Sequence, residues 1–520
     1  MPSEPAKDQR LHPSSGLFIF IAAIRGVLIP LAAMLVFAGD SSIWLYVAGF
    51  AVIPAMFGFL FKYISFRYRL DHDEMVIRQG IVNKNERHIP YARIQNIDLR
   101  QNPLHRLFRV AEARLETASG GEPEAVIRVL SMEAVGELRR KVFADQAIAG
   151  EVNEAGVPVD AGPQAEVLFH MPPGEIVRYG LISNRGMVVV AAVFGLLYQT
   201  GAFGDEETGV VAQIVDRSID QLSVGFVEDR AQQMVWVGAI LVVLALIGVR
   251  LLSVALALVK LYGFTVTRRG DDLRTEYGLF TRVSATIPIH RIQSLTTRQG
   301  ALHRLFRRTV IEVETAGGGG ADGEEAGDQK GSKRQWIAPV IPEQRVAELV
   351  SQIMPEIDLA EPAWRSVEFR AWRRRIKPLV FLLLLMVGLL PWTLTLSESI
   401  SSGMAWTWAG VGWMVGLPLV FLVSRRMVAA EGWAVSPQAV YYRSGVIRRC
   451  RSVVRFMKIQ AVGMRQNPFD RRHRMARVRV DTAGASQVGH KVDIPYLACD
   501  TANDLMEQLY AEASRTGFRW

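Results

Sequence analysis

Arginine and histidine side chains recur at fixed spacing in three segments of the 520-residue sequence. The members of this basic cluster are Arg100, His105, Arg106 and Arg109 in the first segment, Arg298, His303, Arg304 and Arg307 in the second, and Arg465, Arg471 and Arg472 in the third. Guanidinium groups gathered in this way bind phosphates or carboxylates. The pattern therefore makes these residues a candidate binding site for lipid phosphates or for an acidic protein partner.

A structural role explains the same pattern. The leucine and phenylalanine beside the arginines would fill the interior of a sheet, and the arginines would form a solvated face or pair with Glu112, Glu116 and Glu312. Identical spacing in several copies is also what a shared fold requires. Both interpretations remain open at the level of sequence.

The cluster lies inside an internal repeat. The first copy reads IPYARIQNIDLRQNPLHRLFRVAEARLETASGG (89–121), the second IPIHRIQSLTTRQGALHRLFRRTVIEVETAGGG (287–319), and the third KIQAVGMRQNPFDRRHRMARVRVDTAG (458–484). An Ile-Gln pair, an Arg-Gln pair and a Thr-Ala pair follow one another at the same spacing each time. We expect the Ile-Gln and Thr-Ala pairs to be structural. The chain is therefore built from three related modules.

Short alternating and β-branched segments surround each copy, and an amphipathic segment follows it. In residues 131–146 the apolar positions Val135, Leu138 and Val142 recur at helical spacing. Residues 342–353 and 501–513 repeat this pattern. The order predicts several antiparallel strands closed by one helix in every module.

Two apolar runs precede each copy, at 16–37 and 43–61, at 187–198 and 234–259, and at 376–396 and 404–423. Runs of about 20 apolar residues span a bilayer as helices. Lysine and arginine flank the pairs, whereas the loop 200–233 is acidic, and cationic flanks favour the cytoplasmic side. We therefore predict six spans in three hairpins, with modules and both termini in the cytoplasm.

Arg25 and Arg250 lie inside predicted spans. An intramembrane cation usually faces other helices or a polar cavity. These residues suggest an alternative function, a transporter or lipid-handling protein with a polar path among the helices. A shifted span that lets the side chain reach the interface explains Arg25 equally well.

Composition and motifs give little support for an enzyme. The net charge of +9 fits the basic cytoplasmic side of a membrane protein better than nucleic-acid binding, and the two cysteines exclude a disulfide framework. HExxH, GxSxG and Walker motifs are absent, and the GxGxxG at 318–323 precedes no predicted helix. We expect no catalytic residue, no metal and no cofactor.

The segments IPYARIQNIDLRQNPLHRLF and LETASGG resemble the bacterial pleckstrin-homology-like membrane proteins of the YdbS/YdbT type. The resemblance covers nearly the whole chain. It implies an α+β membrane protein of the bacterial cytoplasmic (inner) membrane, with six transmembrane helices in three hairpins. Each hairpin would be followed by a PH-like antiparallel β-sandwich or barrel with a C-terminal helix. Its implied partners are membrane lipids and a smaller one-domain relative or a second copy.

The third copy departs from the pattern at three places. Lys458 replaces Arg93, Arg455 stands where Pro90 does, and Asp470-Arg471-Arg472 replaces Leu104-His105-Arg106. These differences put a shared ligand role of the third module in doubt.

The expected organisation is as follows: hairpin 16–63, PH-like domain 64–146, linker 147–180, hairpin 181–260 with the outer loop 200–233, PH-like domain 261–356 with a flexible insertion 317–335, basic linker 357–375, hairpin 376–424 and PH-like domain 425–520. The leading functional hypothesis is a non-enzymatic scaffold that presents cytoplasmic PH-like domains to protein partners or anionic lipid headgroups.

Overall fold

The computed structural model describes residues 9–10, 65–80, 84–91, 94–117, 125–142, 165–199, 230–315, 334–359, 363–396, 402–482 and 492–515. The predicted hairpin 16–63, most of the predicted outer loop and most of the predicted insertion lie outside these residues. The chain forms two compact units that divide between Thr286 and Ile287. This boundary falls inside the predicted second domain.

The first repeat is a sandwich of two antiparallel sheets. One sheet has the order β1 (Gln9–Arg10), β2 (Arg67–Leu70), β3 (Glu74–Gln79) and β4 (Asn85–Pro90); the other contains β5 (Ile94–Gln101), β6 (Val110–Thr117) and β7 (Ala125–Ser131). Helix α4 (Met132–Val142) follows β7. Apolar residues of both sheets and of α4 form one buried core. The predicted order of strands and closing helix is confirmed here.

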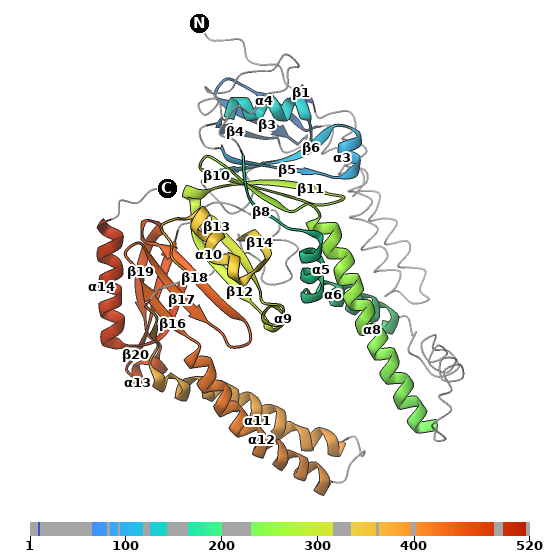
Figure 1. The fold of residues 1–520 in the computed structure, drawn as a ribbon, viewed down its shortest axis with the longest axis vertical. Coiled ribbons are helices and arrows are strands. Elements are labelled where there is room, and N and C mark those ends of the chain that lie inside the picture. Colours follow the sequence, from blue (N-terminus) through green and yellow to red (C-terminus); the bar gives the residue numbers. More distant parts are fainter. Residues whose placement is uncertain are drawn as a thin grey trace. The chain divides into compact units, whose positions relative to one another are not determined.

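The second sheet of the first repeat continues into the second repeat (Figure 1). Its order is β7-β6-β5-β11-β10-β9-β8, in which β8 (Glu166–His170), β9 (Thr265–Arg269), β10 (Asp272–Tyr277) and β11 (Arg282–Pro288) belong to the second repeat. Strand β5 thus pairs with β6 of its own repeat and with β11 of the next. Local sequence patterns did not predict this sharing of strands.

The second unit repeats the arrangement. A seven-stranded sheet has the order β14-β13-β12-β18-β17-β16-β15, and a three-stranded sheet has the order β19-β20-β21. The strands are β12 (Ile292–Gln299), β13 (Arg308–Thr315), β14 (Arg334–Pro342), β15 (Arg365–Ser366), β16 (Gly432–Val435), β17 (Ala439–Ser444), β18 (Arg449–Arg455), β19 (Ile459–Arg465), β20 (Met475–Thr482) and β21 (Val492–Ala498). Helix α10 (Val346–Ile353) follows β14, and α14 (Cys499–Arg515) closes the core of the third repeat.

The two junctions between repeats have the same register. Gln101 lies opposite Arg282 in the first unit, and Gln299 lies opposite Arg449 in the second. Gln101 and Gln299 occupy one repeat position, as do Arg282 and Arg449. Both junctions between consecutive repeats therefore use the same strand pairing in the same register.

The repeated Ile-Gln and Thr-Ala pairs meet across this fold. Ile94, Ile292 and Ile459 lie opposite Thr117, Thr315 and Thr482, respectively, and the register shifts at the following glutamine in all three repeats. Such a shift marks a β-bulge, which bends the strand and increases its twist. The identical spacing of the two motifs follows from this cross-strand pairing.

The apolar segments of the described residues form helices. They are α5 (Pro173–Ile182), α6 (Arg185–Gln199), α8 (Arg230–Leu261), α11 (Trp372–Leu396) and α12 (Ser402–Ala429). Within these residues, Trp236–Leu261 and Trp406–Ala429 are long and apolar enough to cross a bilayer, and α5 with α6 makes a third candidate. The chain bends by 48° between α5 and α6, so residues 181–198 of the predicted hairpin do not form one continuous helix.

Each described hairpin is bracketed by paired strands. Strand β8 precedes α5 and pairs with β9 after α8, and β15 precedes α11 and pairs with β16 after α12. Strand β1 pairs with β2 in the same way. Parts of the predicted linkers 147–180 and 357–375 are therefore strands and the beginnings of helices. The pairing brings both ends of a hairpin to one place.

Candidate functional site

The basic cluster lies on a short helical turn that follows β5, β12 and β19, the same strand of each repeat. These turns are α3 (Pro103–Leu107), α9 (Ala301–Leu305) and α13 (Pro468–Arg472). His105 Nδ1 accepts a hydrogen bond from the Asn102 amide at 3.2 Å, and Asp470 Oδ2 accepts from the Asn467 amide at the same distance. Both are capping contacts that satisfy backbone donors.

This geometry corrects the alignment of the third copy. Asp470 takes the place of His105, so Arg471 corresponds to Arg106 and Phe469 to Leu104. A carboxylate replaces imidazole because both accept the same backbone hydrogen bond. In the second repeat, burial and, secondly, the charge of Arg448 lower the pKa of the His303 imidazole, which favours the neutral form. Within the cluster, His105 acts as a cap.

The arginine two residues after each helical turn has a left-handed backbone in every repeat. The φ angles are 52° at Arg109, 51° at Arg307 and 52° at Arg474. Their carbonyls accept hydrogen bonds from Met132, Glu343 and Cys499, at the start of each closing helical segment, at 3.2 to 3.3 Å. The side chains of the three arginines are exposed. The backbone at this position is structural, while the guanidinium groups face solvent.

The middle arginine binds the next repeat. Arg106 Nη2 donates to the carbonyls of Leu279 and Phe280 at 3.2 Å, and Arg304 Nη2 donates to the Ile447 carbonyl at 3.3 Å. Phe280 and Ile447 lie at the same repeat position, in the turn between two strands. The arginine thus bridges two modules of one unit, a partner that the sequence did not indicate.

The strand arginines of the cluster have different surroundings. Arg298 Nε lies 3.3 Å from the Glu312 carboxylate, whose pKa burial raises against the opposing charge of Arg298. Arg100 lies across the ladder from Glu112, which is bound by Arg114 at 2.9 Å. Arg465 and the turn residues Arg471 and Arg472 are exposed. The expected pairing with glutamate therefore holds for Arg298.

The turn beside α3 is joined to the end of a candidate span. In the first unit, the Leu279 amide donates to the Val259 carbonyl at 3.0 Å, and the Gly278 amide donates to the Tyr262 carbonyl at 2.9 Å. Val259 lies within the span Trp236–Leu261. Since Arg106 binds the Leu279 carbonyl, the basic turn of the first repeat lies at the level where this helix ends.

The turn α13 has a similar neighbour in the second unit. Arg374, near the start of α11, pairs with Asp470, and Lys377 Nζ lies 5.9 Å from the centre of the Phe469 ring. Large apolar side chains are exposed beside both turns, with 74% of Leu107 and 59% of Phe469 accessible. Exposed apolar side chains among cations are typical of surfaces at a membrane interface.

Arg250 braces the break between α5 and α6. Its Nη1 donates to the carbonyls of Leu181 and Ser183 and to Asn184 Oδ1 at 3.2 to 3.3 Å. A cation at a helix C-terminus satisfies carbonyls that have no partner within the helix. Arg25, the other predicted intramembrane residue, lies outside the described residues.

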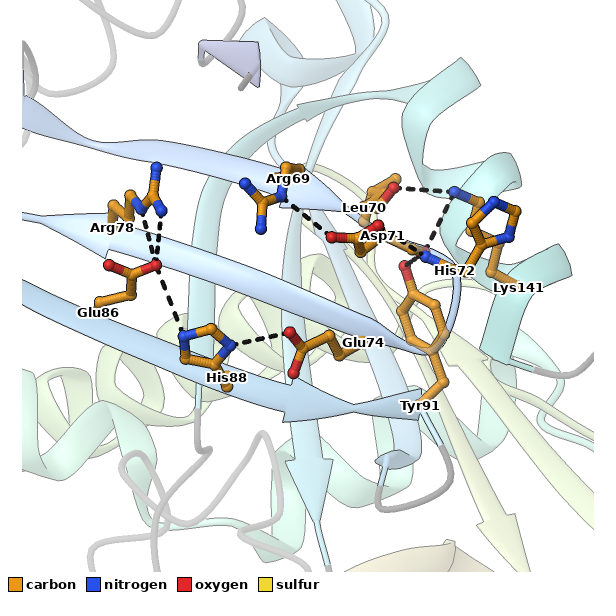
Figure 2. A network of polar contacts seen from close by, with 10 residues as sticks. All are labelled: Arg69, Leu70, Asp71, His72, Glu74, Arg78, Glu86, His88, Tyr91 and Lys141. Atoms are coloured by element: carbon orange, nitrogen blue, oxygen red, sulfur yellow. Dashed lines mark hydrogen bonds and ion pairs between the residues drawn. The ribbon is translucent and has the colours of Figure 1, made fainter. Parts of the chain in front are cut away.

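A polar network on the first sheet was not predicted (Figure 2). Arg78 binds Glu86 at 2.8 Å, and the His88 Nδ1 lies 2.9 Å from Glu74. Lys141 of α4 donates to the Leu70 carbonyl at 3.0 Å. These contacts tie β4 to β3 and the closing helix to the end of β2. Charged residues at both ends of 74–78 and along 86–88 were the available signal.

Arg455, which stands at the position of Pro90, has a defined role. The guanidinium is buried and donates to the Ile289 and Ile292 carbonyls at 3.1 and 2.8 Å and to Glu356 at 3.0 Å. Because these partners belong to the second repeat, Arg455 ties two repeats of the second unit together.

Comparison with known proteins agrees with this architecture. The family model "Bacterial PH domain" matches residues 17–146, 218–356 and 379–513. The chain is 22% identical over 507 residues to the "UPF0699 transmembrane protein YdbT" of Bacillus subtilis (strain 168), with 94% of each chain covered. No solved structure matches. Three matched segments, each holding one basic turn and one closing helix, show that the chain belongs to the bacterial PH domain family.

Proposed function

We propose that this protein is a non-enzymatic scaffold of the bacterial cytoplasmic membrane, anchored by six helices in three hairpins. Its three PH-like modules face the cytoplasm, and their basic turns bind anionic lipid headgroups. The observation that carries the proposal is the contact between Leu279 and Val259. Leu279 lies in the turn between β10 and β11, and its carbonyl accepts a hydrogen bond from Arg106. The contact therefore joins this turn to the last turns of a candidate membrane helix.

The exposed arginines fit this location. Arg109, Arg471 and Arg472 are exposed, so their guanidinium groups are accessible to phosphates at the bilayer surface. Each such cation contributes roughly 1 kcal/mol near an anionic leaflet. The exposed Leu107 and Phe469 would insert among the headgroups beside them.

A protein partner is the second candidate. The structural support is the pairing of strands between repeats, because a module that binds its neighbour through a sheet edge is suited to bind another module in the same way. The transporter alternative has less support, since Arg250 is engaged with the carbonyls between α5 and α6.

The lipid part is tested with the full chain in mixed phosphatidylglycerol–phosphatidylcholine micelles. We expect Arg471→Gln with Arg472→Gln to lower retention of phosphatidylglycerol, measured by native mass spectrometry, by about 30-fold, since two cations are lost. Raising the salt concentration should weaken retention by the wild type.

The matched control is Arg345→Gln with Arg515→Gln, which removes the same charge from exposed positions near α10 and at the end of α14. This control should retain phosphatidylglycerol as the wild type does. Equal retention by the wild type and the α13 variant would count against lipid binding by the basic turn.

A further inference from the structure

Two strands at sheet edges, β4 and β19, have no outer partner strand in the described part of the chain, although the strands at the same positions of other repeats have one. Strand β4 ends the first sheet of the first repeat, and β19 ends the second sheet of the third repeat. At the corresponding positions inside the chain, β11 pairs with β5 and β18 pairs with β12. The edges β4 and β19 are therefore the two halves of a junction that occurs twice within the chain.

Burial differs accordingly between strands at the same repeat positions. In β12, which has a strand on each side, Ser294, Thr296 and Thr297 are buried. In β19 the corresponding residues Ala461, Gly463 and Met464 are exposed, although β20 pairs with the inner edge. An uncovered strand of this kind presents free backbone donors and acceptors.

Strand β4 shows the complementary difference. Residues 85–88 are all exposed, whereas β11 alternates between buried and half-buried positions from Val283 onward. The contacts of Figure 2 hold Glu86 and His88 against β3, so the strand is ordered before any partner binds. A pre-formed edge reduces the entropic cost of association.

We propose that β19 of one chain pairs, antiparallel, with β4 of a second copy. The two internal junctions define the register. Val283 lies opposite Arg100, and Cys450 lies opposite Arg298, so Asn85 of the second copy lies opposite Arg465. Glu86 then lies opposite Met464. The inference deepens and rests on the proposed scaffold function, because it names the protein partner and the surface that binds it.

A second copy is the favoured occupant because each chain carries both edges in the described residues. The interface is head-to-tail, since β19 and β4 are different surfaces. Such an interface closes into a ring or extends as a row of chains, depending on the rotation between copies. Pairing also removes two exposed edges that would otherwise favour aggregation.

The test is disulfide formation between two differently tagged full-length chains in native membranes. Cys450 and Cys499 are first replaced by serine. One chain then carries Glu86→Cys and the other Met464→Cys, and oxidised heterodimer is quantified on gels. A separate chain with Thr297→Cys and Arg451→Cys places cysteines at the same positions of the internal junction and reports that oxidation works.

We expect heterodimer from the pair 86 and 464, and about tenfold less when Arg465→Cys replaces Met464→Cys, because neighbouring residues point to opposite faces of a strand. Absence of heterodimer, or equal yields from both pairs, overturns the proposal when the internal control forms its disulfide. A disulfide to a different protein at position 464 overturns the choice of a second copy.

The same membranes are assayed for retained phosphatidylglycerol. Loss of heterodimer with unchanged lipid retention rejects the edge pairing alone. Absence of retained phosphatidylglycerol, with the heterodimer still formed, instead rejects the lipid part of the proposed function and supports the edge pairing.

Discussion

At the scale of residues, the repeated arginines combine backbone and side-chain roles. Arg109, Arg307 and Arg474 adopt the left-handed conformation that glycine tolerates best. Their exposed side chains, in contrast, are positioned near the basic turn. An arginine thus recurs at this repeat position although its left-handed backbone conformation is unfavourable for a residue with a side chain.

Substitution at Arg307 separates these roles. Arg307→Gly should leave stability unchanged or raise it by up to about 1 kcal/mol, because glycine adopts positive φ without a steric cost. Arg307→Val should lower stability by about 1–2 kcal/mol, since a β-branched side chain strains this conformation. Thermal unfolding of the full chain in detergent measures the difference, with Arg307→Lys as control. Equal destabilisation by glycine and valine would contradict the backbone role.

Lys458 gives the third repeat a dependence on pH. Burial, and secondly the charge of Arg455, lower the pKa of the Lys458 ammonium to about 8. The unfolded chain keeps a value near 10.5, so between these values it binds more protons than the folded chain, and stability rises with pH. The stability gained by deprotonation of Lys458 is complete above the pKa of the unfolded chain and is lost as the pH falls through 8.

We therefore expect the midpoint of denaturation to rise between pH 8 and 10 for the wild type relative to Lys458→Met. The methionine variant should also be more stable than the wild type at pH 7, because it carries no charge to bury. Lys84→Met, at an exposed position, is the control and should follow the wild type. A parallel pH dependence of wild type and Lys458→Met would refute the assignment.

At the scale of elements, close helix packing depends on single glycines. A Cβ atom at Gly186 would lie 2.3 Å from the Val249 carbonyl oxygen and 2.4 Å from Ser253 Oγ. The Gly186 amide also donates to this hydroxyl at 2.9 Å. The start of α6 can therefore approach α8 only without a side chain at residue 186.

Gly186→Ala should separate α6 from α8 and lower stability by about 1–3 kcal/mol, as overpacking does elsewhere. Gly195→Ala is the matched control in the same helix, because a Cβ atom added there would meet nothing within 4 Å, and it should be neutral or stabilising. Thermal denaturation in detergent compares the two. Similar melting temperatures would show that the helices accommodate the methyl group.

Local sequence patterns predicted the order of strands and helices in each module, but they did not predict some of the short strands. Strand β8 pairs with β9, and β15 pairs with β16, across an intervening helical hairpin. The first lies beside a segment rich in glycine, proline and acids, and the second has two residues. Their strand conformation depends on distant partners, which local periodicity does not reveal.

At the scale of the whole molecule, the sequence predicted three modules but not how they join. The identical spacing of Ile-Gln and Thr-Ala reflects a bulge and its cross-strand partner inside each repeat. The junctions depend on non-local pairing of β5 with β11 and of β12 with β18, and no residue type is specific to it. Likewise, Arg106 and Arg455 contact backbone carbonyls of neighbouring repeats, and such partners leave no pattern in the sequence.

The strand pairs that bracket the hairpins have a consequence for biogenesis. Because β15 precedes α11 and β16 follows α12, their ladder forms only after both helices have been synthesised. The same order holds for β8 and β9, which enclose α5, α6 and α8. In each such repeat the sheet is therefore completed only after the whole helical segment has left the ribosome.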